Sequence, residues 1–212
     1  AGLAVLIGLT LGLFAGFLGG WVDEFVLYLY QTLASIPYLL LILALAFIFK
    51  NGEFKDIYDG WVISKYISLG LFNIILVIGC TSWVTLCRLI RGEVKKVREL
   101  DYIQAARALG VSEAKIIFRH ILPNLAHLIV ITFVLMFSGL VLSEAVLSWL
   151  GIGVDGSWGQ MIDGARDELS RQPIVWWNIA AAGSALFGLI LAVNSVGDAV
   201  RDVLDPRTAR ES

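Results

Sequence analysis

Long apolar stretches without a charged residue dominate the pattern of this chain. Five such runs contain no Asp, Glu, Lys or Arg, and they cover residues 1–22, 25–49, 66–87, 121–143 and 172–197. A helix rises about 1.5 Å per residue and the hydrocarbon layer of a bilayer is about 30 Å thick, so each run is long enough to cross a membrane. The apolar residues are continuous and do not alternate with polar ones, which favours helices over the strands of a membrane barrel. The pattern therefore predicts an all-α, polytopic membrane protein.

The runs predict five spanning helices within a single domain that covers residues 1–212. We expect the helices at about 2–19, 25–49, 66–87, 124–147 and 173–196. The segments between and after them are predicted as external loops at 50–65 and 148–172, a cytoplasmic loop at 88–123 and a cytoplasmic tail at 197–212.

Glycine and proline subdivide the first two predicted helices. Gly8, Gly12 and Gly16 recur every four residues and place small residues on one face of the first helix, a pattern typical of close helix packing in membranes. We expect the chain to break into a short turn at residues 19–24, which begin with two glycines. Pro37 lacks a backbone N–H and should kink the second helix.

The composition excludes one broad class of protein, and the distribution of charge orients the chain. Hydrophobic residues make up 58% of the chain and charged residues only 16%, against about 25% in soluble globular domains, which rules against a soluble enzyme. The cytoplasmic loop and tail carry eleven Lys and Arg residues, and the two external loops carry five. Because the side richer in Lys and Arg faces the cytoplasm, the C-terminus is predicted to lie inside and Ala1 outside. An external start on an apolar helix, with no initiating Met, leads us to expect one more spanning helix upstream.

The cytoplasmic loop carries the most informative local pattern. Asp101 and Gln104 have the spacing of a capping box, in which each side chain bonds to an amide at the start of a helix. Alanines follow and favour a short helix, Gly110 can end it in the left-handed conformation, and Ser112 can cap a second helix. Pro123 should end or bend that second helix at the membrane. The loop is therefore predicted as a helix, a glycine turn and a helix outside the bilayer.

Two adjacent alanines give the first of these short helices a small-residue face. They are Ala105 and Ala106. A solvated linker has no need of such a face, whereas close approach by another protein does. We therefore expect this helix to contact a partner protein.

Four motifs, in the same order along nearly the whole chain, resemble one known family. The first is the Glu-Ala-Ala…Gly…Leu-Pro loop of the permease subunits of bacterial binding-protein-dependent ABC importers, and its counterparts here are Gln104, Ala105, Ala106, Gly110, Leu122 and Pro123. The oligopeptide and dipeptide branch, with its close nickel-transporting relatives, is resembled in particular at residues 119–124, 143–153, 157–159 and 197–206. Gln104 departs from the family, which usually has Glu at this position.

The resemblance implies a type-1 ABC transmembrane domain in the bacterial cytoplasmic (inner) membrane. Such a subunit pairs with a homologous permease, binds two cytoplasmic ATPase subunits and receives its substrate from an external solute-binding protein; no nucleic acid is involved. The loop docks into a groove of the ATPase, and the residues that the resemblance places in this coupling loop are Asp101, Gln104, Ala105, Ala106, Gly110, Leu122 and Pro123. The chain has no G-x-x-x-x-G-K-[ST] motif, so we expect ATP to bind to the partner subunits and this chain to hold no cofactor and no catalytic site.

A few polar residues lie in or beside the apolar runs. Glu144 is a candidate for the substrate path, because carboxylates near membrane interiors often line polar paths, although it could instead cap a helix at the interface. Asn73, Asn178 and Asn194 are interpreted as hydrogen-bonding groups between helices. The two histidines lie seven residues apart, about 10 Å along a continuous helix, which is too far to share one metal ion, and no metal site is predicted.

Import of peptides is the predicted function, and import of nickel or another small solute is the alternative. A secondary transporter would also explain the helices, but such proteins commonly have inverted repeats and intramembrane charges for coupling ions, which this sequence does not show. A membrane enzyme would need a nucleophile, a pair of acids or a metal cluster, and no such residues have suitable spacing.

Overall fold

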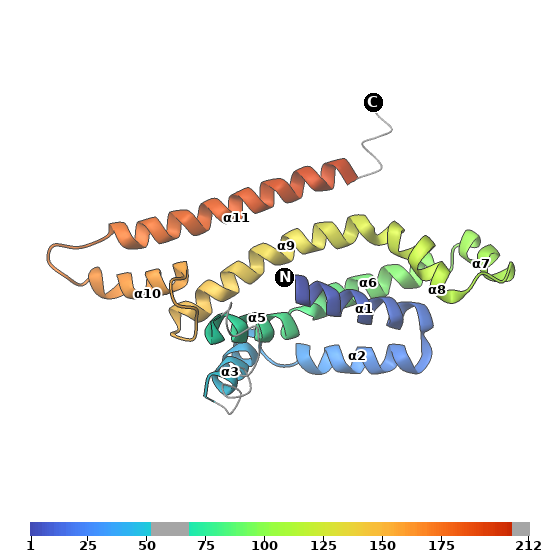
Figure 1. Ribbon diagram of the computed structural model, residues 1–212, viewed down its shortest axis with the longest axis horizontal. Helices are drawn as coiled ribbons and strands as arrows, with labels where there is room; N and C mark the ends of the chain where they lie inside the picture. The colour runs from blue at the N-terminus through green and yellow to red at the C-terminus, as the bar shows by residue number, and fades with distance from the viewer. Residues whose placement is uncertain (52–67, 205–212) are drawn as a thin grey trace. The chain divides into compact units, whose positions relative to one another are not determined.

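The computed structural model of the protein describes residues 1–51 and 68–204 (Figure 1). Within these residues the regular secondary structure is helical throughout, with no strand, as the sequence predicts. Residues 50 and 51 of the predicted external loop at 50–65 are helical, whereas its remaining residues and the end of the predicted tail lie outside the described residues. The chain forms two compact units, the first made of Ala1–Ile36, Cys80–Phe133 and the chain from Ala199, the second of Pro37–Gly79 and Val134–Asp198.

The first unit is built on three helices that lie side by side. Its elements are α1 (Gly2–Leu18), α2 (Gly20–Ala34), α6 (Trp83–Val97), α7 (Asp101–Ala108), α8 (Glu113–Ile116), the π-helix η2 (Ile117–Ile121) and the start of α9 (Leu122–Trp149). Figure 1 shows α1 along α6, with α2 beside them. Helices α1 and α6 lie so close together that a Cβ added at Gly8, Gly12 or Gly16 would be only 2.7–2.8 Å from an atom of α6. The predicted glycine face is therefore confirmed as a packing surface.

The turn predicted at residues 19–24 is much shorter in the structure. Only Gly19, with φ 68°, separates the two helices, and α2 begins at Gly20. Asp23 lies in the first turn of α2, where the helix dipole favours a negative charge. Its carboxylate binds the Arg91 guanidinium and, at 2.6 Å, the Lys95 ammonium of α6, so the acid is neutralised within the helix and no turn is needed.

The third span predicted from the sequence is too short at its C-terminal end, because the prediction stops at the first charged residue. That span was expected to stop at residue 87, but α6 continues to Val97. Leu86, Ile90 and Val94 are fully buried at a spacing of four residues, so one stripe of α6 remains apolar while its other faces carry charge. The helix therefore persists beyond the first arginine.

The second unit contains the other helices of the described residues. They are α3 (Tyr38–Asn51), most of α5 (Leu69–Thr81), the greater part of α9, α10 (Trp158–Glu168) and most of α11 (Trp177–Leu204). A buried apolar cluster at its centre consists of Ile42, Ile74, Val77, Ile78 and Leu147. Helix α10 lies within the stretch that was predicted as an external loop at 148–172, and this correction has a simple cause. The residues of α10 are too polar to give an apolar run. The helix forms nevertheless, and the Ser157 hydroxyl caps it by accepting from the backbone N–H of Gln160 at 3.2 Å.

Three asparagines hydrogen-bond between helices, as predicted. The Asn73 amide donates to the Phe49 carbonyl at 3.3 Å, linking α5 to α3. The Asn178 amide donates to Glu168 of α10 at 2.6 Å, and Asn194 of α11 accepts from the Ser138 hydroxyl of α9 at 2.9 Å. Each bond pairs a polar group of one helix with a polar group of another.

The number of spanning helices falls short of the predicted five within the described residues. Three helices there are long and apolar enough to cross a membrane, namely Leu69–Val97, Glu113–Trp149 and Trp177–Val203. The bent pair α2 and α3, separated around Pro37, would make a fourth, and α1 has only 17 residues. Pro37 thus breaks the predicted helix 25–49 into two helices, because its ring and missing N–H interrupt the helical bonds. The predicted fourth and fifth spans, 124–147 and 173–196, are lengthened to Glu113–Trp149 and shifted to Trp177–Leu204.

Candidate functional site

The first short helix of the predicted cytoplasmic loop is present, but the capping box is not. Helix α7 covers Asp101–Ala108, and its N-cap is Leu100, with no capping bond from a side chain. Asp101 is thus the first helical residue, where its charge still suits the helix dipole. The Gln104 amide donates to the Arg98 carbonyl at 3.0 Å, so it closes the loop behind the helix and does not cap it.

Gly110 ends α7 in the left-handed conformation, as predicted. Its φ is 78°, its amide donates to the Arg107 carbonyl at 3.0 Å, and the Val111 amide donates to the Ala106 carbonyl at 3.1 Å. This pair of bonds is the Schellman motif, which satisfies carbonyls that a helix end would otherwise leave unpaired. The motif fixes the direction in which the chain leaves α7.

Valine at position 110 should loosen this turn. A Cβ at Gly110 would meet no atom within 4 Å, so the cost comes from the backbone alone, about 1–2 kcal/mol for a side chain in the left-handed region. We expect the Gly110→Val variant to exchange the Val111 amide hydrogen about tenfold faster in hydrogen–deuterium exchange, since 1.4 kcal/mol corresponds to a factor of ten. Gly110→Asn is the control, because asparagine tolerates this conformation, and equal exchange in both variants would contradict the explanation.

The two alanines of α7 do not share a face, which corrects the predicted small-residue face. Ala105 is exposed, whereas Ala106 is half-buried next to the fully buried Ile103. Successive residues on a helix are about 100° apart, so adjacent alanines point in different directions. The outer face of α7 consists of the exposed residues Asp101, Ala105, Ala108 and Leu109, and Leu109 has 84% of its surface exposed.

The second short helix continues into the membrane helix, so Pro123 does not end it. Ser112 occupies the N-cap of α8 without a side-chain bond, and α8 passes through η2 into α9 without a break. Leu122 begins α9, half-buried, and Pro123 follows it, exposed. The five-residue π-turn before them changes the hydrogen-bond register, so that the helix accommodates a residue that has no N–H. The Asn124 amide donates to the Tyr102 hydroxyl at 2.8 Å and so joins α9 to α7.

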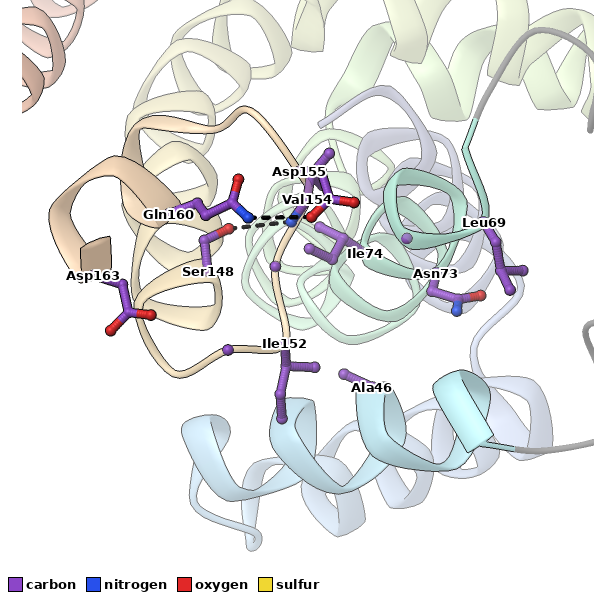
Figure 2. Close-up of a pocket in the computed structure, with 13 residues that line it drawn as sticks. Ala46, Leu69, Asn73, Ile74, Ser148, Ile152, Val154, Asp155, Gln160 and Asp163 are labelled. Atoms are coloured by element: carbon purple, nitrogen blue, oxygen red, sulfur yellow. Dashed lines mark hydrogen bonds between the residues drawn. The ribbon is translucent and has the colours of Figure 1, made fainter. Parts of the chain in front are cut away.

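The second unit holds a cavity of about 330 Å³ that the sequence did not predict (Figure 2). Its polar lining comes from Asn73 of α5, Ser148 of α9, Asp155 in the loop that follows α9, and Gln160 and Asp163 of α10. Figure 2 shows Gln160 hydrogen-bonded to Asp155, at 3.1 Å, and the Ser148 hydroxyl accepting from the Val154 amide, at 3.3 Å. The described lining contains two carboxylates and no Lys, Arg or His, so it can accept hydrogen bonds and attract positive charge.

Glu144 hydrogen-bonds to Ser148, one of the residues that line the cavity. It does not line the cavity, but its carboxylate accepts from the Ser148 hydroxyl at 2.5 Å, one helical turn along α9. No sequence signal pointed to the lining residues Asp155, Gln160 and Asp163, because they lie on α10 and the loop before it, within the predicted external loop. The sequence singled out Asn73 of the lining only as a hydrogen-bonding group between helices, and Glu144 beside the lining as a substrate-path candidate, owing to its place beside an apolar run.

Comparison with known proteins gives one consistent result. Residues 8–210 match the family described as binding-protein-dependent transport system inner membrane component. The chain is 30% identical over 208 residues to the oligopeptide transport system permease protein OppC of Bacillus subtilis, covering 97% of this chain and 61% of that protein. It is 32% identical over 207 residues to the glutathione transport system permease protein GsiD of Pectobacterium atrosepticum, covering 96% and 62%. It is 30% identical over 207 residues to the dipeptide transport system permease protein DppC of Alkalihalophilus pseudofirmus, covering 96% and 61%, so the chain spans about three-fifths of the length of these relatives.

Proposed function

Because this chain belongs to the family of binding-protein-dependent transport system inner membrane components, we propose that it is a permease subunit of an ATP-driven peptide importer. The observation that carries the proposal is the family match together with α7, a short helix between long apolar segments of the sequence, whose outer face includes Ala105, Ala108 and the exposed Leu109. Relatives named as oligopeptide and dipeptide permeases support peptides as the substrate class.

The proposed partners follow from what this chain lacks and what its family supplies. The sequence has no phosphate-binding loop, so ATP binds to and is hydrolysed by two separate cytoplasmic ATPase subunits. A homologous permease pairs with this chain, and an external solute-binding protein delivers the peptide. The complex lies in the bacterial inner membrane, with the C-terminus and α7 on the cytoplasmic side, where Lys and Arg are more frequent.

The proposed coupling site is the segment from α7 to the start of α9. Its members are Asp101, Gln104, Ala105, Ala106, Gly110, Leu122 and Pro123. The outer face of α7 contacts the ATPase, whereas Gln104 and Gly110 keep α7 in place through the bond to the Arg98 carbonyl and the left-handed turn. Leu122 and Pro123 mark the passage into α9.

Uptake by the reconstituted complex tests the proposal. Vesicles that contain both permeases, the ATPase subunits and the binding protein should accumulate labelled dipeptides and oligopeptides only with ATP and all components present. In a chain without Cys80 and Cys87, a cysteine at Ser112 should react only with reagents that enter the cytoplasm, and one at Asp163 should react from outside. ATP-dependent uptake of other solutes with no peptide uptake would refute the substrate class, and labelling of Ser112→Cys from outside would refute the orientation.

Glu144 is proposed to act on the substrate path through Ser148. In Glu144→Gln the side-chain oxygen can still accept from the Ser148 hydroxyl, so the fold is kept while the negative charge is lost. We expect uptake of peptides with a protonated amino terminus to fall about fivefold, the effect of roughly 1 kcal/mol. Assembly with the partner subunits should be unchanged, and wild-type uptake would leave Glu144 with a structural role only.

A further inference from the structure

Arg98, the residue that caps the C-terminal end of α6, binds the C-terminal end of α1. The Arg98 guanidinium donates through Nη1 to the carbonyls of Gly16, at 3.0 Å, and Phe17, at 3.2 Å. The last carbonyls of a helix have no partner within the helix, so Arg98 satisfies two of them and places positive charge at the negative end of the helix dipole. A Cβ at Gly19 would lie 3.1 Å from the same Nη1, so the glycine leaves room for this approach.

A second arginine contacts the same end of α1 from α7 itself. The Arg107 guanidinium lies 5.5 Å from the ring centre of Phe17, within the range of a cation–π contact. Phe17 is only 4% exposed, so its ring is fixed by packing and offers a stable surface. Arg107 is also held by an ion pair with Glu113 at 3.2 Å, just beyond the Gly110 turn.

Helix α7 is joined to Arg98 as well, through the backbone. The Gln104 amide donates to the Arg98 carbonyl, so a single residue bonds to α1 with its side chain and to α7 with its backbone. Ile103, fully buried, adds an apolar anchor on the inner face of α7. Two connections therefore join α7 to the end of α1, one direct through Arg107 and one through Arg98, although 82 residues separate Gly16 from Arg98.

We propose that Arg98 and Arg107 are positioning residues that fasten α7 to the C-terminal end of α1, so that the two move as one body during transport. The inference rests on the proposed function, in which the ATPase moves α7. A displacement of α7 then moves α1 directly. The bonds of Arg91 and Lys95 on α6 to Asp23 on α2 carry the movement on to α2. The Tyr102–Asn124 bond delivers the same displacement to α9.

Distance measurements between spin labels test whether α7 and α1 move together. Cysteines introduced at Leu18 and at Leu100, the N-cap residue of α7, carry the labels; both positions are exposed and neither belongs to the outer face of α7, and the labelled chain lacks Cys80 and Cys87 and is studied within the full complex in lipid nanodiscs. The distance should be the same without nucleotide and with ATP and vanadate trapped. In the Arg98→Ala, Arg107→Ala double variant the distance should become broad and change on trapping. A wild-type distance that changes on trapping overturns the inference, whether or not the complex imports peptides.

The ratio of peptide taken up to ATP hydrolysed separates positioning from simple stability. In Arg98→Ala this ratio should fall about tenfold, within the range usual for coupling between two sites. Arg98→Lys should recover most of it, because an ammonium group can still donate to one of the carbonyls. Arg88→Ala removes a positive charge from the exposed surface of α6 and should keep the wild-type ratio. If Arg98→Ala lowers uptake and hydrolysis in equal proportion, the residue is only structural and the inference is wrong; if wild-type complex hydrolyses ATP without importing peptides, the proposed function fails and the distances still decide the inference.

Discussion

Replacing Ala105 with glutamate is expected to release the ATPase subunits from the complex and to reduce peptide uptake to background. Ala105 is exposed on the outer face of α7, and glutamate is a good helix former, so the chain itself should fold normally. In the complex the new carboxylate would be covered by the ATPase. A buried charge without a partner costs several kcal/mol, more than a single contact contributes. Copurification of the ATPase with the variant, together with uptake, measures the effect.

The same substitution elsewhere in the segment provides the control. Ala114 is exposed on α8 and is not one of the proposed coupling residues, so Ala114→Glu should keep both the ATPase and uptake. Ala106 is unsuitable for this test, because it is half-buried and a glutamate there would disturb the packing of α7 on its own chain. Wild-type binding and uptake in Ala105→Glu would show that the outer face of α7 is not the docking surface.

Local rules predicted the features of α7 that depend on a few neighbouring residues. Gly110 was predicted to be left-handed because glycine favours that conformation after a run of alanines, and the structure has it so. The predicted capping box is wrong because it depends on where the helix begins. The spacing of Asp101 and Gln104 fits a cap only if Asp101 precedes the helix, and the sequence does not say whether the first helical residue is 101 or 102.

Contacts between distant residues explain the corrections to the helices. Arg91 and Lys95 looked like the start of a cytoplasmic loop, because their partner Asp23 lies about 70 residues earlier and the sequence alone does not pair them. The cavity of the second unit was missed for the same reason. Asn73 and Asp163 line one cavity although they lie 90 residues apart in the sequence, and α10 itself was hidden by its polar composition.

The glycine repeat of α1 was predictable, since spacing by four residues directly places small residues on one helix face. Its consequence for stability is the last expected result. A methyl group at Gly12 would lie 2.7 Å from the Cys87 carbonyl oxygen and 3.0 Å from the Ile90 Cβ, and the backbone carbonyl cannot move without shifting α6. Gly12→Ala should therefore destabilise the protein by about 1–3 kcal/mol, as overpacking does in other tightly packed sites. Thermal unfolding in detergent measures the loss.

The matched control for Gly12→Ala is a glycine on the partner helix. Gly92 of α6 has no atom within 4 Å of the position of an added Cβ, so Gly92→Ala should leave stability unchanged or raise it by up to about 1 kcal/mol, because alanine is the better helix former. Separation of α1 from α6 would also pull the end of α1 away from Arg98. Gly12→Ala should accordingly expose Arg98 and Phe17 to solvent and lower uptake together with stability, whereas equal unfolding temperatures for the two alanine variants would show that α1 and α6 are not in close contact.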